Sequence, residues 1–130
     1  MPATLSALIA CLETIGEFGG AAKLSPDIVG RARVVVEELF SNTIKYGYGR
    51  ECDRPVRLTL TAAAGLVLVY EDEAPAFDPS SWRSAGPARS AAEAPRVGEA
   101  GLALLFGLSS SVAYETAAVG NRLVVTFAET

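Results

Sequence analysis

The stretch VVVEELFSNTIKYGYG, residues 34–49, decides how the rest of the chain is interpreted. Its Val, Leu, Phe and Ile residues recur at helical spacing, and the pattern stops at the glycines that end the stretch. In a helix, Glu38 and Asn42 stand one turn apart. At about 100° per residue they lie about 40° apart, on one flank of the apolar stripe. A pocket wall is expected on that flank, where buried surface meets open surface.

A carboxylate and a carboxamide on one such edge can do chemistry that packing alone does not need. Glu38 could take a proton from an attacking hydroxyl or water. The side-chain oxygen of Asn42 is a hard ligand suited to Mg²⁺. The alternative is a solvated glutamate beside an asparagine that frays the end of a helix. These two residues alone do not decide between the alternatives.

Outward from this stretch, a run of helices is followed by a run of strands, and the order then repeats. Thr4 and Ser25 are suited to cap two amphipathic helices, and Gly19-Gly20 is expected to end the first. The expected helices cover residues 4–18, 26–46 and 101–108, and the expected strands cover 56–60, 66–70, 112–116 and 122–127. This order predicts an α+β fold, a two-layer α/β sandwich whose mostly antiparallel sheet is covered on one face by helices.

The composition indicates a globular chain and argues against several classes of function. The 130 residues are half hydrophobic and one-fifth charged, which predicts a single domain over residues 1–130. The net charge of −4, without a Lys/Arg cluster, argues against nucleic-acid binding. No apolar run reaches the roughly 18 residues that span a bilayer, and no secretory signal is visible, so a cytoplasmic protein is expected. The absence of histidine excludes a Ser-His-Asp triad and a histidine metal site.

A second candidate segment is YEDEAPAFDPSS, residues 70–81, where a strand ends in acidic residues and the chain turns. Asp72 at a strand end could accept a hydrogen bond from an amino group on a base, and a plain acidic turn is the alternative. Phe77 is expected to plug the core rather than to stack on a ligand. Residues 74–98 lack apolar periodicity, which is typical of a functional loop or lid.

A third candidate segment is RVGEAGLALL, residues 96–105, where two glycines precede an apolar helix. Small residues at a helix N-terminus let backbone N–H groups approach a phosphate, and the helix dipole favours an anion. Taken alone this pattern is weak, because two glycines spaced in this way before a helix are common.

In their order and spacing, the three segments resemble the motifs of the GHKL ATPases, which share the Bergerat ATP-binding fold. The resemblance is closest to the bacterial anti-sigma factor serine/threonine kinases. Residues 38–42, followed by Tyr46-Gly47, match the family's Glu-x-x-x-Asn motif. Residues 72–79 match Asp-x-Gly with a Pro-Phe-Asp-Pro-like run, and residues 98–102 match Gly-Gly-x-Gly-Leu. Residues 112–123 look like the family's last hairpin, so the resemblance covers nearly the whole chain.

The resemblance implies a site for ATP and Mg²⁺ that serves phosphoryl transfer. Asn42 would hold Mg²⁺ and contact the cofactor, and Glu38 would be the general base that orients a serine hydroxyl of a protein substrate. Asp72 would accept a hydrogen bond from the adenine amino group. The remaining motif and lid positions expected at the cofactor are Ala74, Phe77, Arg96, Gly98, Gly101 and Leu102. Among these, Arg96 would neutralise γ-phosphate charge from a lid over residues 78–97, and Gly98 and Gly101 would let N–H groups reach the phosphates.

Two positions depart from the family pattern. Ala74 stands in place of glycine, so its methyl group is expected to crowd the approach to adenine and to disfavour a positive φ. Glu99 also stands in place of glycine, and a carboxylate about 4 Å from a phosphate charge costs roughly 1 kcal/mol in water. These departures leave open a degenerate module that binds partner proteins and not ATP.

The resemblance also implies partners, namely a sigma factor and an antagonist protein with a phosphorylatable Ser or Thr. Family members often dimerise, which leaves a homodimer open, whereas nucleic acid and membrane are not expected as partners. A further alternative is the detached ATP-binding domain of a histidine kinase. Because the chain has no histidine, such a domain would have to act in trans on another protein.

Overall fold

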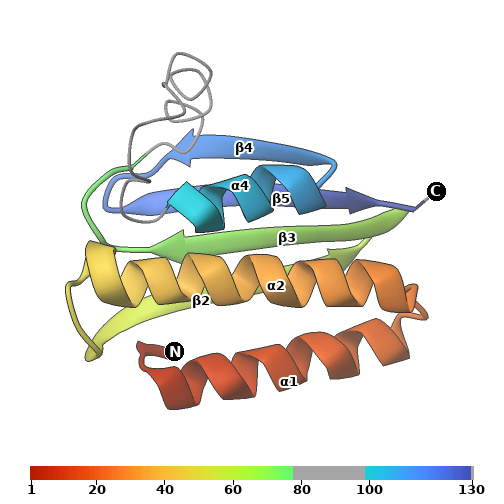
Figure 1. Ribbon diagram of the computed structural model, residues 1–130, viewed down its shortest axis with the longest axis horizontal. Coiled ribbons are helices and arrows are strands. Elements are labelled where there is room, and N and C mark those ends of the chain that lie inside the picture. The colour runs from red at the N-terminus through yellow and green to blue at the C-terminus, as the bar shows by residue number, and fades with distance from the viewer. Residues whose placement is uncertain (78–98, 130) are drawn as a thin grey trace.

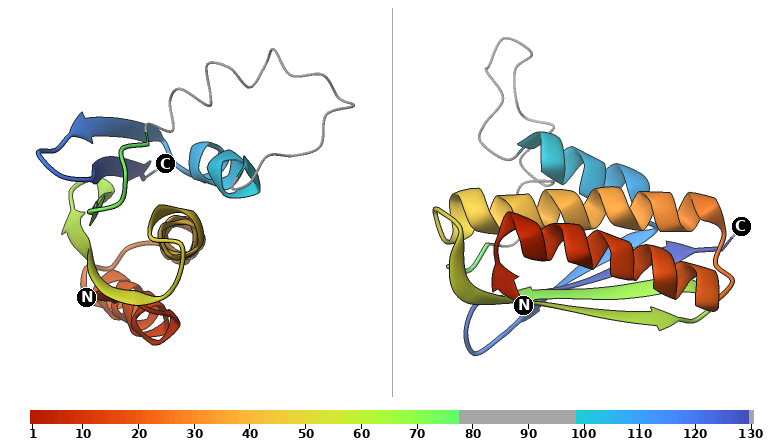
Figure 2. Two further views of the ribbon diagram at one scale, coloured as in Figure 1. Left: turned by 90° about the vertical axis from the view of Figure 1, so that its left-hand side faces the viewer. Right: turned by 90° about the horizontal axis from the view of Figure 1, so that it is seen from below.

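The computed structural model describes residues 1–77 and 99–129 and has the predicted two-layer α+β architecture (Figure 1). Its elements are β1 Pro2–Ala3, α1 Leu5–Ala21, α2 Pro26–Asn42, the π-helix η1 Thr43–Gly47, β2 Cys52–Ala62, β3 Gly65–Asp72, α4 Glu99–Leu108, β4 Ser111–Thr116 and β5 Asn121–Ala128. The strands form one antiparallel sheet in the order β1-β2-β3-β5-β4. Helices α1, α2 and α4 cover one face of the sheet (Figure 2). The predicted fold class is therefore confirmed.

The predicted caps of the first two helices are confirmed. Thr4 accepts a hydrogen bond from the Ala7 N–H at 3.2 Å, and Ser25 accepts one from the Ile28 N–H at 3.2 Å. The predicted end of the first helix at Gly19-Gly20 is wrong, because α1 continues to Ala21. A Cβ atom at Gly19 would lie 2.3 Å from Val29 Cγ2, so this glycine provides close packing between α1 and α2.

The end of α2 departs from a regular α-helix. The chain turns through η1, in which the Tyr48 N–H donates to the Thr43 carbonyl at 2.7 Å. π-helical turns are rare, and they occur frequently at functional sites. Here the wider turn follows directly on Asn42, the residue that the sequence singles out as a ligand. The predicted helix to residue 46 is therefore correct in extent but not in type.

The central strand β3 pairs with β2 on one side and β5 on the other. Its last residue, Asp72, lies opposite Val56 of β2 and Asn121 of β5. Alternate residues of β3 and β5 face the helices and are buried, as are the inward residues of α1 and α2. The largest fully buried side chains of this core include Ile15, Phe40, Leu66, Leu68, Leu105 and Phe127.

Two further boundaries differ from the sequence prediction. β1, a strand of two residues, was not predicted, and it pairs with the start of β2, where Pro2 lies opposite Pro55. Proline is tolerated there because this position lies near the edge of the sheet. Helix α4 begins at Glu99, two residues before the predicted start. Within the ranges 1–77 and 99–129, no helix is both long and apolar enough to cross a membrane.

Candidate functional site

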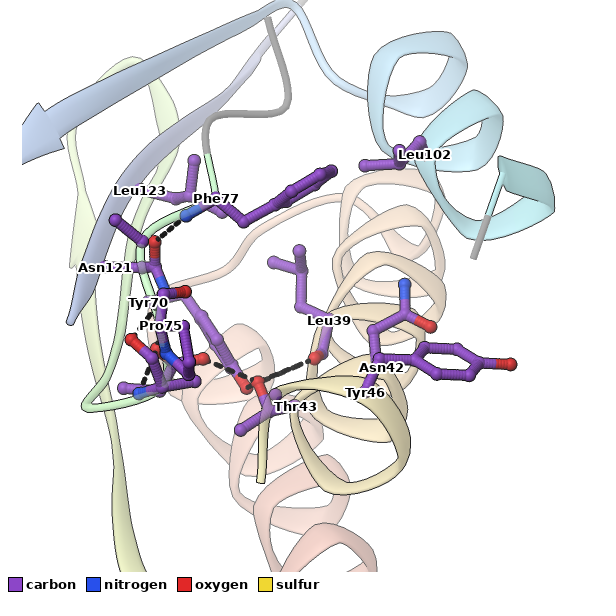
Figure 3. A pocket seen from close by; sticks show the side chains of 14 residues that line it. Leu39, Asn42, Thr43, Tyr46, Tyr70, Pro75, Phe77, Leu102, Asn121 and Leu123 are labelled. Atoms are coloured by element: carbon purple, nitrogen blue, oxygen red, sulfur yellow. Dashed lines mark hydrogen bonds between the residues drawn. The ribbon is translucent and has the colours of Figure 1, made fainter. Parts of the chain in front are cut away.

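A cavity of about 340 Å³ lies between the C-terminal end of α2, the end of β3 and helix α4. This volume is in the range of small-molecule sites. In Figure 3, Asn42 and Tyr46 stand on the α2 side, and Tyr70 and Asn121 stand on the sheet side, with Leu39 between them. The described residues that line the cavity are Leu39, Asn42, Thr43, Tyr46, Gly47, Tyr70, Asp72, Ala74, Pro75, Ala76, Phe77, Leu102, Asn121 and Leu123.

Asp72 lies in the floor of this cavity and is 7 % exposed. Its Oδ2 accepts a hydrogen bond from the Thr43 hydroxyl at 2.8 Å, and its Oδ1 accepts from the Ala74 N–H at 3.2 Å and from Asn121 Nδ2 at 2.9 Å. A carboxylate offers about four acceptor positions. The donors among the described residues use three of these positions, which leaves one, on Oδ2, for a donor from a ligand.

Tyr70 extends this network to helix α2. Its hydroxyl lies 2.6 Å from Thr43 Oγ1 and 3.2 Å from the Leu39 carbonyl oxygen. Thr43 Oγ1 lies near two groups that can only accept, Asp72 Oδ2 at 2.8 Å and the Leu39 carbonyl oxygen at 3.0 Å. We place its proton on the shorter contact, to the Asp72 carboxylate, and Tyr70 then donates to Thr43 or to the Leu39 carbonyl. Burial raises the pKa of the Tyr70 phenol, and the hydrogen bond with Thr43 offsets part of that rise. The phenol is therefore a neutral donor at physiological pH.

The turn after Asp72 is also held from outside the cavity. The Tyr48 hydroxyl accepts a hydrogen bond from the Glu73 N–H at 2.8 Å and donates to the Pro55 carbonyl at 2.7 Å. Arg54 donates to the Glu73 carbonyl at 2.8 Å and lies 4.5 Å from the centre of the Tyr48 ring. Burial raises the pKa of Tyr48, and the hydrogen bond from Glu73 lowers it in part. Both backbone polar groups of Glu73 are thus fixed.

Ala74 is buried, and its methyl group packs against Gly47. A Cβ atom built at Gly47 would lie 2.8 Å from the Ala74 Cβ, so the missing side chain at residue 47 makes room for the methyl group at residue 74. Ala74 has no positive φ. The expected conflict between alanine and a left-handed backbone at this position therefore does not arise.

Asn42 and Glu38 are both half-buried on α2, but only Asn42 lines the cavity. Among residues 1–77 and 99–129, the Asn42 carboxamide has no hydrogen-bond partner, so both of its polar atoms are available to a ligand. Glu38 lies one helical turn before Asn42, outside the set of described lining residues.

Some of the other predicted site positions lie among the described residues, and the rest lie outside them. Phe77 is 55 % exposed and lines the cavity, so the expectation that it plugs the core is wrong. Figure 3 shows its ring directed toward Leu102, which is buried in α4 and lines the cavity as well. Gly101 lies in the first turn of α4. Arg96, Gly98 and the predicted lid over residues 78–97 lie outside the described residues, and so does the start of the Gly-Gly-x-Gly-Leu match.

Several residues of the cavity were missed by sequence reasoning. The sequence analysis gives Thr43 no role in the site, although its hydroxyl binds Asp72. Asn121 falls within residues 112–123, the segment that resembles the family's last hairpin, and it received no role in the site, although it is buried there. Tyr46 was noted in the first motif without a role, and it lines the cavity. A polar residue on an otherwise buried face was the available signal for Thr43.

The residues present fit a nucleotide with a magnesium ion. The apolar middle of the cavity suits a planar base. Counting only contacts with residues 1–77 and 99–129, Asp72 has a free acceptor position at one end and the Asn42 carboxamide has no partner at the other. Within the part of the chain that the structure describes, no group of three or more His, Cys, Asp or Glu residues could hold a metal ion. Mg²⁺ is usually held by one or two protein ligands together with phosphates and water, and Asn42 is the described residue that would hold it here.

Comparison with known proteins identifies the class to which this fold and cavity belong. Residues 1–127 match the family model of the histidine kinase-like ATPase domain. The chain therefore belongs to that family and is an ATP-binding domain of the GHKL type. No curated protein matches the chain in a sequence search.

Proposed function

We propose that this protein is an ATP-dependent serine/threonine kinase of the anti-sigma factor type. On this proposal it acts in the cytoplasm and phosphorylates an antagonist protein on Ser or Thr, and it binds a sigma factor when the antagonist does not compete. Arg96, Gly98 and Gly101 keep the phosphate-binding roles that the family resemblance implies.

The proposal is carried by one observation: a single cavity joins Asn42, Asp72 and Leu102. These residues come from three motifs that are far apart in the sequence. Asp72 would bind the amino group of the base, and Leu39, Leu102 and Leu123 would exclude water around the ring. Asp72 is the one charged residue among the described lining residues, and its charge is negative like that of the phosphates. Bound Mg²⁺ would therefore supply the positive charge that offsets the phosphates.

Asn42 is proposed to bind the metal-nucleotide complex, and this role is tested by calorimetric titration with ATP, with and without Mg²⁺. Binding is expected to require Mg²⁺ and to weaken about tenfold to hundredfold in Asn42→Ala, as the loss of one good ligand predicts. Ser41→Ala, which changes the adjacent half-buried residue outside the described cavity lining, is the matched control and should bind as the wild type does. No binding by the wild type, or binding without Mg²⁺ dependence, would contradict the proposal.

Glu38 is proposed to be the general base for the serine hydroxyl. Glu38→Gln should leave the affinity for Mg-ATP within about threefold and lower phosphoryl transfer to an antagonist protein by about 10²-fold to 10⁴-fold. The measurement follows transfer from ATP labelled in the γ-phosphate. Glu37→Gln alters the neighbouring exposed carboxylate and serves as the control. Undiminished transfer by Glu38→Gln would rule out this role.

A second candidate function is a switch module that acts only through protein contacts. The position of Glu38 favours it, because this carboxylate is not among the described residues that line the cavity. On this reading, titration with ATP gives no Mg²⁺-dependent heat, and Asn42→Ala binds the sigma factor with unchanged affinity. The two candidates therefore give opposite results in the same titration.

A further inference from the structure

Asn121 binds both ends of residues 72–77, the segment that forms the floor of the cavity. It is 8 % exposed and is the first residue of β5, where it lies opposite Asp72 of β3. Its Nδ2 donates to Asp72 Oδ1 at 2.9 Å and faces the Pro75 and Ala74 carbonyls at 3.2 and 3.4 Å. Its Oδ1 accepts from the Phe77 N–H at 2.7 Å.

The orientation of this carboxamide is fixed by its neighbours. On one side Oδ1 meets two donors, the Phe77 N–H and the Tyr114 hydroxyl, the latter at 3.1 Å. On the other side Nδ2 meets a carboxylate and two carbonyl oxygens, which can only accept. A flipped amide would place oxygen against oxygen and N–H against N–H. Asn121 therefore supplies donors on one atom and an acceptor on another, which the side chains of similar shape, Asp and Leu, do not.

The turn before Asn121 is built to bring it this close to Asp72. Gly120 has a φ of +81°, and a Cβ atom there would lie 1.9 Å from the Asp72 carbonyl oxygen. Only glycine permits both this conformation and this approach. With Oδ1 of Asp72 occupied by Asn121 and the Ala74 N–H, the carboxylate is held so that Oδ2 keeps its free acceptor position.

We propose that Asn121 is the positioning residue that sets the base selectivity of this site. It fixes the Asp72 acceptor and the Phe77 backbone relative to each other, and so it makes the site select a purine with an amino group at carbon 6 over one with a carbonyl group there. A carbonyl oxygen would face Asp72 acceptor to acceptor. The inference rests on the proposed function, because it assumes that the cavity takes a nucleoside triphosphate.

The test compares Mg-ATP with Mg-ITP by calorimetry, because these nucleotides carry the same phosphates and differ at carbon 6. The wild type is expected to bind ATP about 10²-fold more tightly than ITP, since a site built around a ligand hydrogen bond strongly rejects an analogue lacking it. We call the Kd for Mg-ITP divided by the Kd for Mg-ATP the selectivity ratio. In Asn121→Ala and in the near-isosteric Asn121→Asp, this ratio should fall below about tenfold, mainly through weaker ATP binding.

Val125→Ala is the matched control for stability. Val125 is fully buried on the same face of β5, and it is not a lining residue of the cavity, so its variant should unfold more easily and keep the wild-type ratio. Tyr114→Phe removes one donor to Asn121, should lower the ratio about twofold to fivefold, and remains informative if the Asn121 variants do not fold.

The outcomes separate this inference from the proposed function. A wild type that binds Mg-ATP, with ratios unchanged within about twofold in the folded variants, would leave Asn121 a purely structural role and overturn the inference alone. A wild type that binds neither nucleotide would overturn the proposed function and the inference with it. A ratio that collapses in the Asn121 variants and not in Val125→Ala supports the inference.

Discussion

Ala74 and Gly47 form a complementary pair of small residues at the edge of the cavity. The methyl group of Ala74 occupies space that any side chain at residue 47 would need. The cavity thus tolerates alanine in place of the family's glycine because the adjoining helix end carries no side chain at that point. A change at either residue is therefore coupled to the identity of the other.

This coupling predicts the result of a double-mutant cycle. Gly47→Ala should lower the free energy of unfolding by about 1–3 kcal/mol, because the new methyl group would lie 2.8 Å from the Ala74 Cβ. Adding Ala74→Gly should restore much of that loss, minus about 0.5–1 kcal/mol for the flexibility of glycine. Urea unfolding of the two single variants and the double variant measures the cycle. Additive losses would show that the two methyl groups do not meet.

At the scale of elements, the contact between α1 and α2 depends on Gly19. Gly19→Ala would place a methyl group 2.3 Å from Val29 Cγ2, so it should lower the free energy of unfolding by about 1–3 kcal/mol. Gly16→Ala in the same helix meets nothing within 4 Å and should raise it by about 0.5–1 kcal/mol through helix propensity. Thermal and urea unfolding measure both variants. Equal effects would mean that the helices can separate at no cost.

The same contact shows where sequence reasoning succeeds and where it fails. Periodicity located the helices and the longer strands, and the caps at Thr4 and Ser25 were found because they depend on adjacent residues. The prediction that Gly19 ends the helix was wrong because the contact that requires glycine there is with Val29, which lies on another helix. The π-turn after α2 has no local signature in the residues it contains.

For the site, motif spacing identified Asn42, Asp72 and Leu102 as candidates, and the structure brings them to one cavity. Asn121 could not be found in this way. It becomes part of the site only through the pairing register that sets it opposite Asp72, and register between β3 and β5 is a property of the assembled sheet.

At the scale of the whole molecule, burial of Tyr70 makes stability depend on pH in the alkaline range. The pKa of its phenol is raised in the folded state, whereas in the unfolded chain it is about 10. Below about pH 10 both states hold the proton, and above it the unfolded state releases the proton first. The free energy of unfolding should then fall by up to about 1.4 kcal/mol per pH unit from this residue.

Urea unfolding between about pH 8 and 11 checks this dependence. Tyr70→Phe should flatten the alkaline decline, although it loses the hydrogen bond to Thr43 and is less stable near neutral pH. Some decline should remain, because burial raises the pKa of Tyr48 and of the Cys11 thiol as well. Equal slopes in the two proteins would exclude Tyr70 as a source.

The sheet order places Asp72 on the strand that opens last. Strand β3 is paired along its length on both sides and runs alongside α2 (Figure 1), whereas β4 pairs with β5 alone in the described sheet. Amide protons of β3 should therefore exchange with solvent deuterium only when the whole domain unfolds, and those of β4 should exchange sooner through local opening. The proposed acceptor for the base would keep its place through every partial opening at the β4 edge.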